Sequence, residues 1–141
     1  MQHTMIKGLV FIWLSLSFFS ALLWAGDDDE AAPPQAIYYA IPDPFTIDFL
    51  HQSKQKARYL QIKVSLMAHD QAVIDSAEQN LPMLQDALRT LFSEQTFETV
   101  NSIEGRKALQ ASALETVKTL LKEETGQDNL DAVYFTSFIL Q

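Results

Sequence analysis

The last nine residues of the chain, 133–141, form a nearly uncharged and mostly apolar run that predicts a β-strand. At a period of two, apolar side chains fall on both sides of this strand: Val133, Phe135 and Ile139 on one, and Tyr134, Phe138 and Leu140 on the other. Chain ends fray unless a sheet or a docked helix holds them. We therefore expect a central strand, covered on both faces by the fold or on one face by a partner.

Composition limits the possible classes of function. A length of 141 residues suits one domain with an accessory segment. The absence of cysteine excludes disulfides, zinc–thiolate sites and thiol nucleophiles. The net charge of −8 would repel nucleic acid and anionic lipid headgroups, so we expect no nucleic-acid partner.

The amino-terminal segment predicts a place in the cell envelope. Lys7 precedes an uncharged run over residues 8–26, and acidic residues follow at 27–30. As a helix this run would span roughly 28 Å, close to the hydrocarbon thickness of a bilayer. The lone base before the run predicts a cytoplasmic amino terminus and an exported remainder. The residues expected to lie in the membrane include Gly8, Leu9, Phe11, Trp13, Phe18, Leu22 and Trp24.

Two fates of this segment stay open. It is either a retained single-pass anchor in the inner membrane or a cleaved signal peptide that leaves a soluble periplasmic protein. A signal peptide usually has an apolar region of about 7–15 residues, and the best cleavage site, Leu23 to Ala25, is mediocre, so we favour the anchor. The predicted organisation is a membrane segment over residues 1–26, an acidic and proline-containing linker over 27–36, and an exported domain over 37–141.

The first part of the exported domain predicts strands. Residues 37–50 are extended, but Pro42 and Pro44 place them at a sheet edge or in two short strands on either side of a turn. Apolar and polar residues alternate over residues 59–68, which predicts a second strand. The polar stretch at 51–57 suggests a hairpin between them.

From Asp70 onwards the pattern becomes helical. The first apolar stripe comprises Ile74, Ala77, Leu81, Leu84, Leu88 and Leu91. Pro82 predicts a kink or a restart capped by Asn80. A later helix should begin at Ser102 and end at Gly126. Its buried side should comprise Leu109, Ala113, Val117, Leu120 and Leu121. Helices of this kind must cover the sheet, so we predict an α+β, two-layer β-β-α-α-β domain.

No catalytic pattern emerges from the polar residues. The histidines at positions 3, 51 and 69 are scattered, and no glycine-rich phosphate loop is present. His69 and Asp70 are adjacent and could act as a catalytic base and the carboxylate that orients it. We favour the alternative, in which Asp70 caps the helix and His69 is exposed. We therefore expect no catalytic, cofactor-binding or metal-binding residues, and no enzyme.

Several blocks, read in order, carry a resemblance to a known family. They are residues 39–47, 58–62, 81–88, 92–96, 103–106 and 133–141, the last with the sequence Val-Tyr-Phe-Thr-Ser-Phe-Ile-Leu-Gln. Together they resemble the FliL family of flagellar basal-body proteins over residues 37–141. The resemblance implies a single-pass inner-membrane protein whose periplasmic domain is similar in fold to the stomatin/prohibitin core. It also implies self-association, assembly around the motor's stator units, and support of flagellar rotation, swimming or swarming and chemotaxis.

The chain departs from the family at its amino terminus. Seven residues with one lysine precede the apolar run, and the linker is short, which fits a divergent paralogue or a cleaved secreted form. A second hypothesis is a generic periplasmic binding module that captures a peptide or small ligand at its sheet edge. The surplus of apolar residues on the last strand suggests an interface, with Tyr134 and Phe138 as its aromatic anchors.

Overall fold

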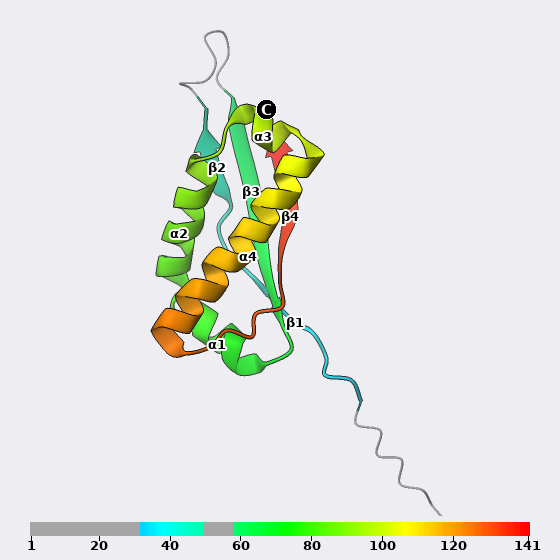
Figure 1. The fold of residues 1–141 in the computed structure, drawn as a ribbon, viewed down its shortest axis with the longest axis vertical. Coiled ribbons are helices and arrows are strands. Elements are labelled where there is room, and N and C mark those ends of the chain that lie inside the picture. The colour runs from blue at the N-terminus through cyan, green and yellow to red at the C-terminus, as the bar shows by residue number, and fades with distance from the viewer. Residues whose placement is uncertain (1–31, 50–57) are drawn as a thin grey trace, which may run out of the picture. The chain divides into compact units, whose positions relative to one another are not determined.

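The computed structural model describes residues 32–49 and 58–141 of the chain. Residues Ala32–Gln141 form one compact unit, in which four helices pack against one face of a four-stranded antiparallel sheet (Figure 1). The order is β1 (Ile37–Ala40), β2 (Phe45–Asp48), β3 (Tyr59–Ala68), α1 (Gln71–Gln79), α2 (Leu81–Ser93), α3 (Phe97–Asn101), α4 (Ile103–Thr125) and β4 (Ala132–Leu140). The predicted α+β class with two layers is confirmed.

The element order differs in detail from the prediction. The first predicted strand is two strands, β1 and β2, as the alternative for Pro42 and Pro44 anticipated. The first helical stripe is divided into α1 and α2, and the short helix α3 was not predicted. The predicted membrane segment at residues 8–26 and the hairpin at 51–57 lie outside the described residues. Within the described residues, no helix is both long enough and apolar enough to cross a membrane.

Strand β3 is the centre of the sheet. β1 pairs with its second half, from Ile37 opposite Ala68, and β2 pairs with its first half, from Phe45 opposite Ile62. Both short strands lie on the same edge of β3, joined by the turn that holds the two prolines. Proline has no N–H to donate, so this position avoids the loss of ladder hydrogen bonds. β4 runs along the opposite edge of β3.

Strand β4 is therefore an edge strand, and the prediction of a central strand was wrong. In the part of the chain that the structure describes, β4 pairs with β3 alone. The central position belongs to β3, because it has hydrogen-bonded neighbours on both of its edges. A strict period of two would place the apolar residues of β4 on both faces of the strand. That apparent pattern has a different cause.

That cause is a β-bulge in the middle of β4. Lys63 lies opposite Ser137 and Val64 lies opposite Phe135, so Thr136 is an extra residue in the strand. A bulge of one residue shifts the alternation of faces by one. The side chains that face the helices are consequently Val133, Phe135, Phe138 and Leu140, while Tyr134 and Ile139 lie on the other face. The predicted division of β4 into two sides was wrong beyond Thr136.

Local capping residues fix where the helices begin and end. The Asp70 carboxylate accepts from the Ala72 N–H at 2.9 Å, and the Ser102 hydroxyl accepts from the Gly105 N–H at 2.9 Å. Gly126 ends α4 in the left-handed conformation, with φ of 74°. These three predicted caps are confirmed. The predicted restart is also confirmed, because α2 begins after Asn80 with Pro82 in its first turn, but the Asn80 side chain makes no capping hydrogen bond.

The core fills the space between the helices and the covered face of the sheet. Phe92 of α2 is fully buried and packs edge-on against Phe45 of β2 and Phe135 of β4, with ring centroids 5.1 and 5.7 Å apart. The predicted buried side of α4 is largely confirmed, because Leu109, Ala113, Val117 and Leu121 are buried and Leu120 is partly buried. The helices thus cover one face of the sheet and leave the other open.

Candidate interaction surfaces

The open face of the sheet carries most of the exposed apolar bulk of the described chain. It holds four of the five large hydrophobic side chains that are exposed there, namely Tyr38, Tyr59, Tyr134 and Ile139. Tyr134, one of the two predicted anchors, is 38% exposed on this face. Aromatic side chains with a polar end are enriched in protein interfaces, so this face is a candidate contact surface.

At one end of this face, Tyr38 and Tyr134 approach each other across β3. Their ring centroids are 6.2 Å apart, and Met67 of β3 lies opposite Tyr38 in the sheet register. We call Tyr38, Met67 and Tyr134 the tyrosine patch. It combines two hydroxyl groups with an apolar body, which suits contact with a protein surface.

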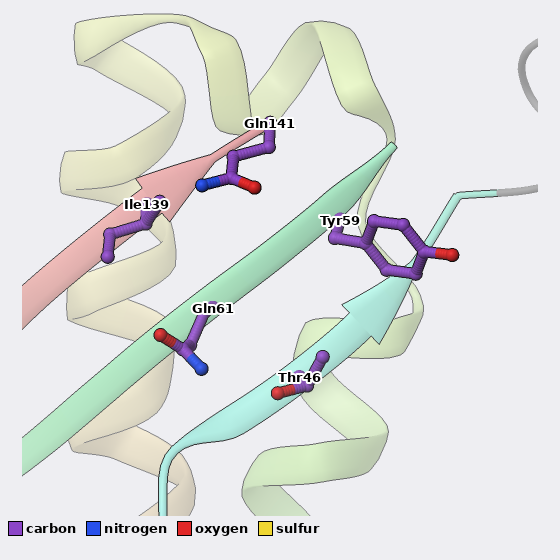
Figure 2. A pocket seen from close by; sticks show the side chains of 5 residues that line it. All are labelled: Thr46, Tyr59, Gln61, Ile139 and Gln141. Atoms are coloured by element: carbon purple, nitrogen blue, oxygen red, sulfur yellow. The ribbon is translucent and has the colours of Figure 1, made fainter. Parts of the chain in front are cut away.

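At the other end of the open face lies a shallow hollow of about 250 Å³. Figure 2 shows the residues that line it, from β2, β3 and the end of β4: Thr46, Tyr59, Gln61, Ile139 and Gln141. The hollow is lined by the amides of Gln61 and Gln141 and the hydroxyls of Thr46 and Tyr59, so it can make neutral hydrogen bonds.

Phe138, the second predicted anchor, lies on the opposite face of β4 from Tyr134. Its side chain is half-buried, its ring centroid is 5.9 Å from that of Phe135, and the Arg106 guanidinium lies over the ring at 4.9 Å. The structure therefore does not bring Tyr134 and Phe138 together. If both bind partners, they belong to two surfaces.

Phe138 lines a groove between α4 and β4, which we call the α4–β4 groove. Two hollows of about 260 and 230 Å³ form it, and they share Lys107 and Gln110. The remaining lining residues are Ile103, Arg106, Ala111, Leu114, Ala132, Val133, Phe135 and Phe138. The charged members of this lining, Arg106 and Lys107, are both cations.

The sequence prediction missed the helical wall of this groove. Ile103 is 67% exposed at the start of α4, which makes it the most exposed large hydrophobic residue of the described chain. Ile103 lies in the first turn of α4, more than one helical turn before Leu109, the first buried residue of this helix. An apolar residue in the first turn of the helix, ahead of its first buried residue, was the available signal for a surface role.

His69 has a different partner from the one considered in the sequence. Its Nδ1 lies 2.9 Å from Asp131 Oδ2, and the same oxygen accepts from the His69 backbone N–H at 3.0 Å. Asp70 caps α1, as expected, so the His69–Asp70 pair of base and orienting carboxylate is not formed. The His69–Asp131 contact joins the end of β3 to the residue before β4, which is a structural role.

Among the ionisable groups of the described residues, Tyr39 has a shifted pKa. Burial, with a further contribution from the Glu78 carboxylate, raises the pKa of the Tyr39 hydroxyl in β1. Among the described residues, no three or more His, Asp or Glu side chains are placed to hold a metal ion together. The predicted absence of cofactors stays a prediction.

Comparison with known proteins identifies the family. The family model described as "Flagellar basal body-associated protein FliL" matches residues 38–141, which include all four helices and nearly the whole sheet. The flagellar protein FliL of Aquifex aeolicus is 29% identical over 113 residues, covering 79% of this chain and 66% of that protein. The flagellar protein FliL of Escherichia coli strain K12 is 29% identical over 141 residues, covering 94% of this chain and 88% of that protein. The chain belongs to the FliL family of flagellar basal body-associated proteins.

Proposed function

We propose that the protein is a non-enzymatic accessory of the flagellar basal body that associates with the stator units of the motor and with copies of itself. In this role it supports flagellar rotation, and with it swimming, swarming and chemotaxis. The observation that carries the proposal is the family match over residues 38–141, which spans nearly all of the two-layer unit. An open sheet face rich in tyrosine gives further support, because it suits binding to proteins.

The proposed location is the bacterial inner membrane. Residues 8–26 would cross it once, with the amino terminus in the cytoplasm and residues 37–141 in the periplasm. The alternative is a cleaved signal peptide and a soluble periplasmic domain. The likeness to the stomatin/prohibitin core, implied by the family resemblance, belongs to the same proposal.

The tyrosine patch is the proposed contact with the motor. Interface energy is usually concentrated in a few aromatic anchors surrounded by residues that exclude water. Tyr134 and Tyr38 stand on opposite sides of β3 with their rings in contact, so both can be covered by one partner surface. A helix layer protects the other face of the sheet, whereas no described element covers this one.

The test is complementation of a gene deletion. The deletion strain should swarm poorly under high viscous load, and the wild-type gene should restore swarming. Tyr134→Ser should fail to restore it, because an interface anchor commonly contributes about 2 kcal/mol or more, roughly a thirtyfold loss of affinity. Tyr134→Phe, which keeps the aromatic ring, is the matched control and should restore swarming.

Each variant must first melt like the wild type in circular dichroism, so that a folding defect is not mistaken for an interface defect. If the deletion strain swims and swarms normally under load, the motor role fails. If folded Tyr134→Ser complements fully, the patch assignment fails while the family membership stands.

A second candidate function, capture of a peptide at the sheet edge, is favoured by one observation. β4 is an edge strand with the α4–β4 groove beside it. Edge strands of this kind bind extended peptides in several classes of recognition domain. The edge and the tyrosine patch lie on different sides of β4, so peptide capture is compatible with the motor role.

A further inference from the structure

The outer edge of β4 has backbone groups available for pairing. β4 is nine residues long, and no strand in the described part of the chain pairs with the edge that faces away from β3. An edge strand presents a row of N–H and C=O groups that another chain can pair with. The Val133 carbonyl takes a hydrogen bond from the Gln110 side chain at 2.8 Å, so it points towards α4 and into the groove.

The α4–β4 groove beside this edge is apolar at its base and cationic at its side. Phe135 and Phe138 line it from the strand, and the exposed Ile103 lines it from the helix. Arg106 and Lys107 supply positive charge in a chain whose net charge is −8. An acidic ligand is repelled by the protein as a whole but attracted at this groove, which is a basis for specificity.

We propose that the α4–β4 groove binds an extended, acidic segment of a partner protein, which adds to β4 as a fifth strand. Backbone hydrogen bonds to the edge of β4 supply affinity in this mode, and alternate side chains supply specificity. Every second residue of the segment faces the groove. Among these residues, apolar side chains lie against Phe135 and Phe138, and acidic ones face Arg106 and Lys107.

Two features of β4 argue against a second copy of β4 as the occupant. The strand Ala132–Leu140 contains no Asp or Glu, so a second copy would bring no carboxylate to Arg106 and Lys107. The bulge at Thr136 interrupts the edge, and natural proteins use such bulges to prevent strands from pairing edge to edge. The bulge leaves two short stretches of regular strand, which suits a short segment.

This inference rests on the second candidate function and deepens it by naming the chemistry of the ligand, and it is independent of the motor role. The tyrosine patch lies on the open face of the sheet, whereas the groove lies on the side of the helices. The two assignments can therefore fail separately, and one variant of each surface distinguishes them.

The experiment uses the full chain in detergent micelles and a fluorescent peptide of about five residues, a typical strand length. Valine and glutamate alternate at every second position of this peptide, so that both face the groove, and threonine fills the positions between them. Fluorescence anisotropy measures binding. The acidic peptide should bind, and its affinity should fall as salt is added. A peptide with lysine in place of glutamate should not bind. An acidic peptide with two prolines should also fail, because it lacks the N–H groups that strand addition requires.

Variants then locate the binding. Lys107→Glu should weaken binding of the acidic peptide about tenfold, since an attraction is replaced by a repulsion at the groove. Lys118→Glu is the matched control on the same helix, outside the groove lining, and should change binding little. Tyr134→Ser should leave peptide binding unchanged.

Hydrogen exchange gives an independent readout of the strand pairing. With the acidic peptide bound, amides of β4 should exchange more slowly, while those of α2 should be unaffected. Failure of the acidic peptide to bind would overturn the inference. Equal binding of the proline or lysine peptide, or equal loss in Lys107→Glu and Lys118→Glu, would overturn it as well.

Discussion

Two glycines of α4 are required for different physical reasons. A Cβ added to Gly105 would collide with the carbonyl oxygen of Thr99 and lie 2.7 Å from the Ser102 hydroxyl oxygen. Gly105 therefore permits the close approach of α3 to the start of α4. A Cβ on Gly126 would meet nothing within 4 Å, but the backbone there has φ of +74°. At Gly126 the requirement is conformational and not steric.

The two sites should rank alanine and asparagine oppositely by the loss in the free energy of unfolding. At Gly126, alanine should lower the free energy of unfolding by about 1–2 kcal/mol, and asparagine by less, because asparagine tolerates the left-handed conformation. At Gly105, alanine should cost about 1–3 kcal/mol through overpacking, and the larger asparagine more. Urea denaturation of the four variants measures these values. If the same substitution were the more destabilising one at both sites, this assignment of roles would be contradicted.

At the scale of elements, β4 depends on Thr136. The extra residue keeps Phe138 and Leu140 on the same covered face as Val133 and Phe135. Without it, one of these two pairs would turn to the open face of the sheet, since strand side chains alternate strictly. The bulge thus reconciles the spacing of the apolar residues with a sheet that is covered on one face.

Deletion of Thr136 should therefore destabilise the domain strongly. Full burial of a Phe or Leu side chain contributes roughly 1.5–3 kcal/mol, and two such side chains would lose their contacts, against a typical total stability of about 5–15 kcal/mol. Thr136→Ala is the control, because it keeps the chain length and removes only a 3.4 Å contact with the Lys63 carbonyl. Melting curves decide the matter: a deletion variant as stable as Thr136→Ala would show that the bulge is dispensable.

Part of the fold was predictable because its signals lie within a few neighbouring residues. The rest depends on contacts between residues that are far apart in the chain. Strand β3 and the caps at Asp70, Ser102 and Gly126 follow from patterns within a few residues, and these predictions are confirmed. The position of β4 at an edge and its bulge depend on pairing with β3, more than sixty residues earlier in the chain. The α4–β4 groove was missed for the same reason, because its two walls meet only in the folded chain.

For the molecule as a whole, the fate of the amino-terminal segment decides where the domain works. If residues 8–26 are a retained anchor, the protein should keep its full mass and stay with the inner membrane after a carbonate wash. The length of the run and the mediocre cleavage site favour this outcome. A chain of residues 32–141 behind an efficient cleavable leader is the control and should be soluble in the periplasm. Recovery of the natural protein in that soluble fraction, with a new terminus near Gly26, would establish the signal peptide.

The pairing of β3 with β4 also sets an order of events in time. Lys63 and Thr136, which meet across this pair, are 73 residues apart in the chain, and all four helices lie between the two strands. Closing so long a loop has an entropic cost that the local contacts of helices do not carry, and non-local pairing slows folding. The helices can form while β4 is still undocked, with Phe135 and Phe138 in water. We therefore expect these side chains to be among the last to reach the core, and a newly made chain to be most exposed to misassociation in that interval.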